Sequence, residues 1–219
     1  TKKYPSNYYI GLKYAKALCE TGQYQPCISL LSRMQVLPNE GSYAGRAVYR
    51  EANLYRAMEQ LSHKNYKQVV KSVETSKEWP ENLGVGKPYD NMIDNRLEDY
   101  LEAKAAAGQG DSRKTSALLA AVADYTISRS HFESGNLLSA LALRESGKVQ
   151  EADHMVAAWI TDFPENRVVQ WCTAIYRGEK EKAVGMLQSR NDQTNTTPWE
   201  ASFRDSNFDL IVRLFSTEQ

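Results

Sequence analysis

The residue types most able to do chemistry in this chain are its histidines and cysteines. They are His63, His131, His154, Cys19, Cys27 and Cys172. None of them lies at the close His/Cys spacing that zinc sites use. A Cys172–His154 nucleophile pair is conceivable, but Cys172 follows Trp171 in an apolar helical stretch, which favours an inert buried thiol. We therefore predict no catalytic residues, no bound metal and no cofactor.

A second candidate for chemistry is the glycine-rich segment Gly84-Val85-Gly86-Lys87. A phosphate-binding loop needs Gly, four residues, and then Gly-Lys-Ser/Thr after a strand. Here Pro88 follows Lys87, and no glycine stands at the required earlier position. The pattern therefore does not predict a nucleotide site.

Composition limits the classes of partner. The 219 residues include 27 Lys+Arg and 27 Asp+Glu, so the formal net charge is zero. Nucleic-acid binding needs an excess of basic residues, so we predict no nucleic-acid partner. No apolar run approaches the roughly 18 residues of a membrane span. Because the chain begins at Thr1 rather than Met, we interpret it as part of a longer protein, with cellular location and oligomeric state left open.

The elements around these residues follow a recurring pattern. An apolar helix ends at Gly, a second apolar helix follows, and Pro closes the unit, as in the stretches that end at Gly22 and Pro38. Tyr24 and Tyr66 are separated by 42 residues, as are Pro38 and Pro80. Asn65 is expected to replace Gly in the second turn. Repeats occupy about 5–38, 43–80, 95–125, 132–164 and 167–190, followed by a C-terminal cap at 198–216.

This frame resembles the tetratricopeptide repeat, in which two antiparallel helices cross at small residues such as Ala15, Ala57 and Ala140. The sequence therefore predicts an all-α protein, a single domain over 1–219 that forms an α-solenoid of about four to five antiparallel helix hairpins. Each hairpin is too thin to bury its apolar face alone, so stacking of neighbours is expected to form the core.

A connector at 79–94 interrupts the repeats. Two Gly and two Pro within 79–90 exclude regular helix or strand there. Trp79, Asn82, Lys87 and Tyr89 could face a ligand or a neighbouring domain. Alternatively, Trp79 and Leu83 could tuck between hairpins and anchor a long turn. The sequence leaves both interpretations open.

The connector also carries a more specific resemblance. Residues 79–88 read Trp-Pro-Glu-Asn-Leu-Gly-Val-Gly-Lys-Pro, and Asp94-Asn95-Arg96 and Tyr100 follow. Over about 43–190 the chain resembles the C-terminal helical region of large Bacteroidetes proteins. These carry an N-terminal domain of unknown function with a sugar-epimerase-like β-sandwich. The resemblance implies a carbohydrate-related parent protein and is compatible with an exported or periplasmic location.

The leading functional hypothesis is a noncatalytic scaffold that binds a protein, a peptide or the N-terminal domain of its own parent chain. Tyrosines crowd the N-terminal third and could serve such an interface or fill the core. An alternative is an accessory region of a carbohydrate-active protein, with 79–90 contributing to a sugar site. The predicted binding residues lie on first helices or on the connector: Asn53, Arg56, Trp79, Asn82, Lys87, Tyr89, Arg96, Tyr100, Asn136 and Arg144.

Overall fold

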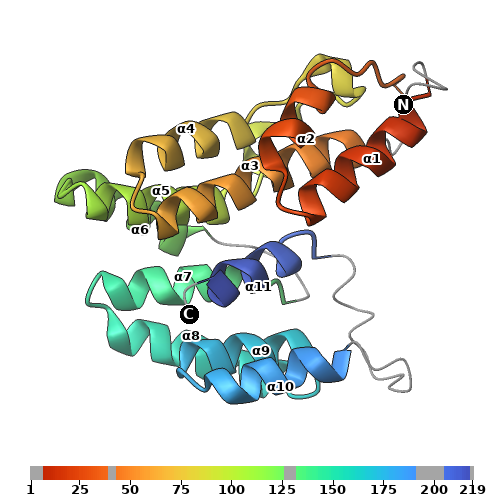
Figure 1. Ribbon diagram of the computed structural model, residues 1–219. Coiled ribbons are helices and arrows are strands. Elements are labelled where there is room, and N and C mark those ends of the chain that lie inside the picture. The colour runs from red at the N-terminus through yellow and green to blue at the C-terminus, as the bar shows by residue number, and fades with distance from the viewer. Residues whose placement is uncertain (1–6, 39–42, 126–131, 191–204, 218–219) are drawn as a thin grey trace. The chain divides into compact units, whose positions relative to one another are not determined.

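The computed structural model describes residues 7–38, 43–125, 132–190 and 205–217. These residues form eleven α-helices and two short 3₁₀ helices, with no β-strand among them (Figure 1). The all-α prediction is therefore confirmed for this part of the chain. The chain divides into two compact units, Thr1–Gln109 and Gly110–Gln219. The division falls in the turn of the predicted third hairpin.

Unit 1 is built from two helix pairs and a fifth helix. Helix α1 packs against α2, α3 packs against α4, and α5 packs against both α4 and α3 (Figure 1). Helix α3 also contacts α1 and α2, so it lies at the centre of the unit. The elements are α1 (Tyr8–Glu20), α2 (Tyr24–Leu31), α3 (Ala44–Ser62), α4 (Tyr66–Ser76), η1 (Glu81–Leu83), η2 (Asp90–Met92) and α5 (Arg96–Gly108).

Unit 2 repeats this pairing. Helix α7 packs against α8 and α9 packs against α10, while α7 also contacts α6 and α9. The helices are α6 (Ser112–Asp124), α7 (Gly135–Glu145), α8 (Val149–Asp162), α9 (Arg167–Tyr176), α10 (Lys180–Arg190) and α11 (Phe208–Thr217). Helix α11 begins at Phe208, and residues 198–204 of the predicted cap lie outside the described residues. The Asp205 side chain just before it accepts hydrogen bonds from the backbone N–H groups of Ser134 and Asn207.

The turn inside each of the first two hairpins needs one residue in the left-handed region. Gly22 supplies it in the first hairpin, with φ +76°, and Lys64 in the second, with φ +59°. These positions are 42 residues apart, the same offset that relates Tyr24 to Tyr66. The prediction that Asn65 takes the place of glycine was wrong, because Asn65 has φ −85° and is the N-cap of α4. Lys64 adopts a conformation that is unfavourable for a side chain with a Cβ.

The core of unit 1 lies between α1, α2 and α3. Small residues stand where the helices approach closely, and Ala15, Ala52 and Ala57 are fully buried. Cys19 and Cys27 are buried free thiols within hydrogen-bond distance of each other across the first hairpin. These two cysteines thus belong to the core, and the hydrogen bond to Cys27, together with burial, raises the pKa of Cys19.

Candidate functional site

The predicted binding residues divide into buried and exposed groups. Four of them, Asn53, Arg96, Tyr100 and, less completely, Asn82, are held by contacts within unit 1. Arg56, half-buried on α3, donates to Gln25 Oε1 at 2.7 Å. Asn136 on α7 is half-buried. Of the others, Trp79 is half-buried, and Lys87, Tyr89 and Arg144 are exposed.

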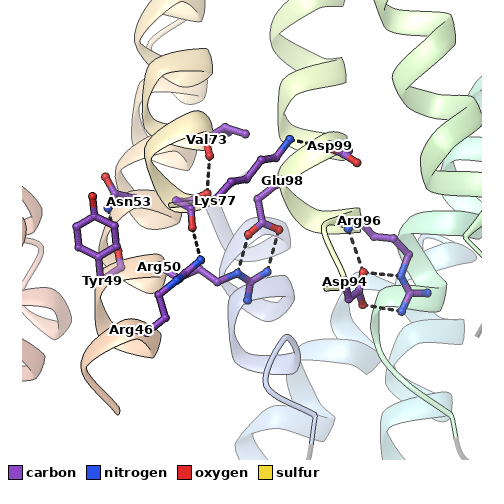
Figure 2. A network of polar contacts seen from close by, with 11 residues as sticks. Arg46, Tyr49, Arg50, Asn53, Val73, Lys77, Asp94, Arg96, Glu98 and Asp99 are labelled. Atoms are coloured by element: carbon purple, nitrogen blue, oxygen red, sulfur yellow. Dashed lines mark hydrogen bonds and ion pairs between the residues drawn. The ribbon is translucent and has the colours of Figure 1, made fainter. Parts of the chain in front are cut away.

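A polar network occupies the packing surfaces of α3, α4 and α5, as Figure 2 shows. Its strongest contact joins Arg50 to Glu98 by two hydrogen bonds, Nε to Oε1 at 2.6 Å and Nη2 to Oε2 at 2.8 Å. The Glu98 side chain is 1% exposed and that of Arg50 is 16% exposed. This two-point ion pair fixes α5 against α3.

Further ion pairs in the network link the end of α4 to α5. Another joins the first residue of α5 to the segment just before it. Lys77 Nζ donates to Asp99 Oδ1 at 2.7 Å and lies 3.6 Å from Glu102 Oε2. Burial lowers the pKa of Lys77, but the bond and charge of Asp99 outweigh it and leave the pKa raised. Arg96, 2% exposed, forms a two-point contact with Asp94 (Figure 2).

Arg46 is the buried cation of this network without a carboxylate partner. Its Nη2 donates to the Ser76 carbonyl at 2.6 Å, and its guanidinium lies 4.5 Å from the centre of the Trp79 ring. Burial, followed by the charge of Arg50, lowers the pKa of Arg46 to about 10. Its Nε and Nη1, and Nε1 of Trp79, have no acceptor among the described residues. One face of the Trp79 ring is therefore covered by Arg46.

The connector has an anchored half and an open half. The Asn82 side chain donates to the carbonyls of Leu31 and Met34, at 2.9 and 2.8 Å, and its own carbonyl accepts from Val36 N–H. Leu83 beside it is fully buried. Beyond Gly84 the chain is open, and Tyr89 is 81% exposed.

The exposed end of the connector holds one local ion pair. Lys87 Nζ lies 2.6 Å from Asp90 Oδ1, and both side chains are largely solvated. Such a pair contributes little to stability. Of the predicted binding residues on the connector, Lys87 and Tyr89 therefore remain accessible to a partner, whereas Asn82 holds the connector to the loop after α2.

Unit 2 contains a cavity of about 260 Å³ that sequence reasoning did not find. Helices α7, α9, α10 and α11 and the α9–α10 turn supply its lining: Leu141, Arg144, Trp171, Ile175, Gly178, Lys180, Ala183, Val184, Leu187, Phe215 and Ser216. Among the predicted residues only Arg144 belongs to it. The lining comes from four helices, so no local pattern could have identified it.

Arg144 is held at the cavity by the end of α9. Its Nη1 donates to the Tyr176 carbonyl at 2.7 Å, and its guanidinium lies 4.7 Å from the centre of the Tyr176 ring. The Tyr176 hydroxyl in turn donates to Asp153 Oδ1 at 2.8 Å. Burial and this bond raise the pKa of Tyr176. The Arg144 guanidinium is thus positioned, on a residue that as a whole is exposed to solvent.

The conceivable nucleophile pair is divided between two helices, with Cys172 on α9 and His154 on α8. Cys172 is fully buried, and burial raises the pKa of its thiol well above the ordinary value. His154 is exposed on α8, His63 follows α3, and His131 lies outside the described residues. No group of three or more His, Cys, Asp or Glu side chains in the described ranges could hold a metal ion.

None of the helices formed by the described residues is both long and apolar enough to cross a membrane. In comparisons with known proteins, no protein family, no curated protein and no solved structure matches this chain.

Proposed function

We propose that the protein is a noncatalytic scaffold, built as a tetratricopeptide-like solenoid, that binds a protein, a peptide or a neighbouring domain. The proposal is supported by the contacts between consecutive first helices. Helix α1 contacts α3 and α3 contacts α5 in unit 1, and α7 contacts α9 in unit 2. This is the neighbour-to-neighbour pattern expected when hairpins stack to share a core.

The observation that carries the binding part of the proposal is the outer face of α1. Tyr9 is 64% exposed and Tyr14 is 52% exposed, and Ile10 lies one turn before Tyr14 on the same face. Exposed tyrosines on a helix favour a protein partner, because Tyr supplies large contact area with a polar tip.

The network of α3, α4 and α5 points to a different use for several predicted binding residues. Asn53 and Arg96 are almost fully buried, and each bonds within its own helix or the residues just before it. A ligand would have to displace these bonds, which buried polar groups cannot lose without a large free-energy cost. We therefore assign Asn53, Arg96 and Tyr100 to the support of the repeats and place the partner-binding surface on α1.

Selection of peptides from a random display library against the whole protein, followed by calorimetry, tests this proposal. We expect the selected peptides to bind the wild-type chain and to bind a Tyr9→Ser/Tyr14→Ser variant at least tenfold more weakly, as for interface aromatics. The matched control is Lys67→Ser/Lys71→Ser, which changes exposed residues on α4. Equal binding by the α1 variant, or no selected peptide, would contradict the proposal.

A second candidate, an accessory region of a carbohydrate-active protein, is favoured by one observation. Tyr89 presents its side chain almost fully to solvent at the open half of the connector, where a sugar ring could stack on it. Titration with a panel of oligosaccharides should then detect binding that Tyr89→Ala removes. Binding that Tyr89→Ala leaves unchanged, or no binding, would exclude this candidate.

A further inference from the structure

The cavity in unit 2 has a polar end and an apolar end. Arg144 is bonded to the Tyr176 carbonyl, two residues before Gly178. Lys180 follows Gly178 by two residues and donates its backbone N–H to the Gly178 carbonyl. Both cationic residues are therefore placed at the α9–α10 turn. Leu187, seven residues further along α10, is about 10 Å from the level of Lys180, at 1.5 Å per residue.

The charge of the cavity is unbalanced. Its described lining includes Arg144 and Lys180 but no Asp or Glu. Neither cation forms an ion pair with a carboxylate among the described residues, although ion pairs occur nearby, as between Lys182 and Glu179. Two cations in a described lining that contains no carboxylate favour a bound group of negative charge.

Apart from Gly178 and Ser216, the rest of the lining is apolar. Leu141, Ile175, Leu187 and Phe215 contribute aliphatic and aromatic surface. Trp171 belongs to the same wall, is 1% exposed, and has an Nε1–H without an acceptor among the described residues. A mostly apolar wall with a few convergent polar groups is the usual composition of a small-molecule site.

We propose that this cavity binds a small carboxylic acid in its anionic form, with the carboxylate at Arg144 and Lys180 and an apolar body along α10. The Arg144 guanidinium has free N–H groups beside the bonded Nη1 and can accept a carboxylate in two-point geometry. The volume of about 260 Å³ lies just below the roughly 300–1,000 Å³ of sites for drug-sized ligands, so the ligand is small. This site is separate from the α1 surface and does not depend on the proposed function.

Calorimetric titration of the whole protein with octanoate and with octanamide tests the proposal. The two probes share one apolar chain and differ in charge. We expect octanoate to bind and octanamide to bind at least tenfold more weakly, because the amide lacks the charge that the two cations recognise. Absence of octanoate binding, or equal binding of both probes, would overturn the proposal.

Substitutions at the polar end of the cavity test whether the carboxylate of the ligand binds there. Arg144→Gln and Lys180→Gln should each weaken octanoate binding about tenfold and bring it closer to that of octanamide. Arg177→Gln and Lys182→Gln are matched controls, since both side chains are exposed in the same unit and neither lines the cavity. Equal weakening by the controls would mean that only general electrostatic attraction is measured, which counts against the site.

A variant that blocks the apolar end covers the case in which a charge substitution disturbs folding. Val184 lines the cavity on α10 and is 43% exposed, so Val184→Phe can fill the cavity without crowding the core. It should abolish octanoate binding while leaving the thermal unfolding midpoint unchanged. Unaltered binding by a folded Val184→Phe variant would contradict the proposed location.

A last titration separates a free acid from the end of a polypeptide, which carries the same chemistry. A short peptide that ends in leucine is compared in its free-acid and amidated forms. We expect octanoate to bind more tightly than either form, because the small volume suits a small ligand. Binding of the free-acid peptide alone, without octanoate, would replace the proposal with a peptide-terminus site.

Discussion

Units 1 and 2 use their charged residues in opposite ways. On α3, α4 and α5 of unit 1, Arg50, Lys77 and Arg96 all pair with carboxylates in contacts of 2.6 to 2.8 Å. In unit 2, Arg144 and Lys180 line a cavity and have no carboxylate partner among the described residues. Helix pairs thus hold a set of paired charges around α5 in one unit, and two cations without a carboxylate partner among the described residues at a cavity in the other.

This difference shows how charged residues on paired helices should be interpreted. A buried charge that is paired on both sides of a helix interface is committed to structure, because its removal leaves a partner unpaired. An exposed cation that the fold positions but does not neutralise remains available to a ligand. Burial and pairing, rather than position on a first helix, separate Arg96 from Arg144.

The largest effect that the comparison predicts is the loss of the Arg50–Glu98 pair. Glu98→Gln keeps the size of the side chain but leaves Arg50 without its anion, and should lower the free energy of unfolding by about 3–5 kcal/mol. Urea unfolding measures it. Glu59→Gln on the exposed face of α3 is the control and should change stability by less than about 0.5 kcal/mol.

A paired replacement sharpens this result. Arg50→Met combined with Glu98→Leu removes both charges and should recover much of the stability that Glu98→Gln loses, since apolar pairs often replace buried ion pairs well. A cost below about 1 kcal/mol for Glu98→Gln alone would contradict the structural assignment of the network.

The next largest effect concerns the anchored half of the connector. Gly84 has φ +75°, and a Cβ at this position would lie 2.8 Å from the Val36 carbonyl oxygen. Gly84→Ala should therefore destabilise unit 1 by about 2 kcal/mol or more. Gly86→Ala is a matched control two residues away, where a Cβ meets nothing within 4 Å. Thermal unfolding of both variants compares them, and equal midpoints would show that the connector is not anchored.

The free energy of unfolding should depend on pH because of Tyr49. Burial and its hydrogen bond to Glu78, at 2.9 Å, raise the pKa of Tyr49 above its ordinary value of 10.0. Because the folded pKa is the higher one, this stabilisation is present below pH 10 and is lost as pH rises toward the folded pKa. The stability advantage of the wild type over Tyr49→Phe should fall by about 1 kcal/mol between about pH 8 and about pH 11. If the stability difference between the wild type and Tyr49→Phe stays constant over this pH range, the Tyr49 hydroxyl is not buried and bonded to Glu78 in this way.

The smallest effect is expected at Arg144. Arg144→Gln removes one bond to the Tyr176 carbonyl and one ring contact at an exposed position, so it should cost less than about 1 kcal/mol of unfolding free energy. Urea unfolding of Arg144→Gln and of Glu98→Gln, measured under the same conditions, tests the contrast between the units directly. If Arg144→Gln lowered the free energy of unfolding as much as Glu98→Gln does, the two units would not differ in how they use these charges.

Part of the fold could be predicted because it depends on local spacing. The offset of 42 residues between Tyr24 and Tyr66 indicated the first two hairpins, and the structure has α2 and α4 begin at these residues. The same offset relates Gly22 to Lys64, but a lysine in the left-handed region carries no sequence signal. The turn therefore fell one residue from where it was predicted.

The candidate site could not be predicted to the same extent. Helical position alone selected Arg96 and Arg144 together, and only packing shows that Asp94 pairs with the first. Trp171 and Phe215 are 44 residues apart in sequence, so their shared cavity depends on how α9 and α11 pack. Long-range convergence of this kind leaves no periodic pattern.

The central claim is that the cations of the unit 2 cavity bind a ligand, whereas the network of α3, α4 and α5 in unit 1 is committed to structure. One nuclear magnetic resonance titration tests it most directly. Octanoate is added to the isotope-labelled whole protein and the backbone amide shifts are followed in both units. We predict saturable shifts in α7, α9, α10 and α11 and none around Arg50 and Glu98. Shifts centred on the network of α3, α4 and α5, or no saturable shifts in unit 2, would contradict the claim.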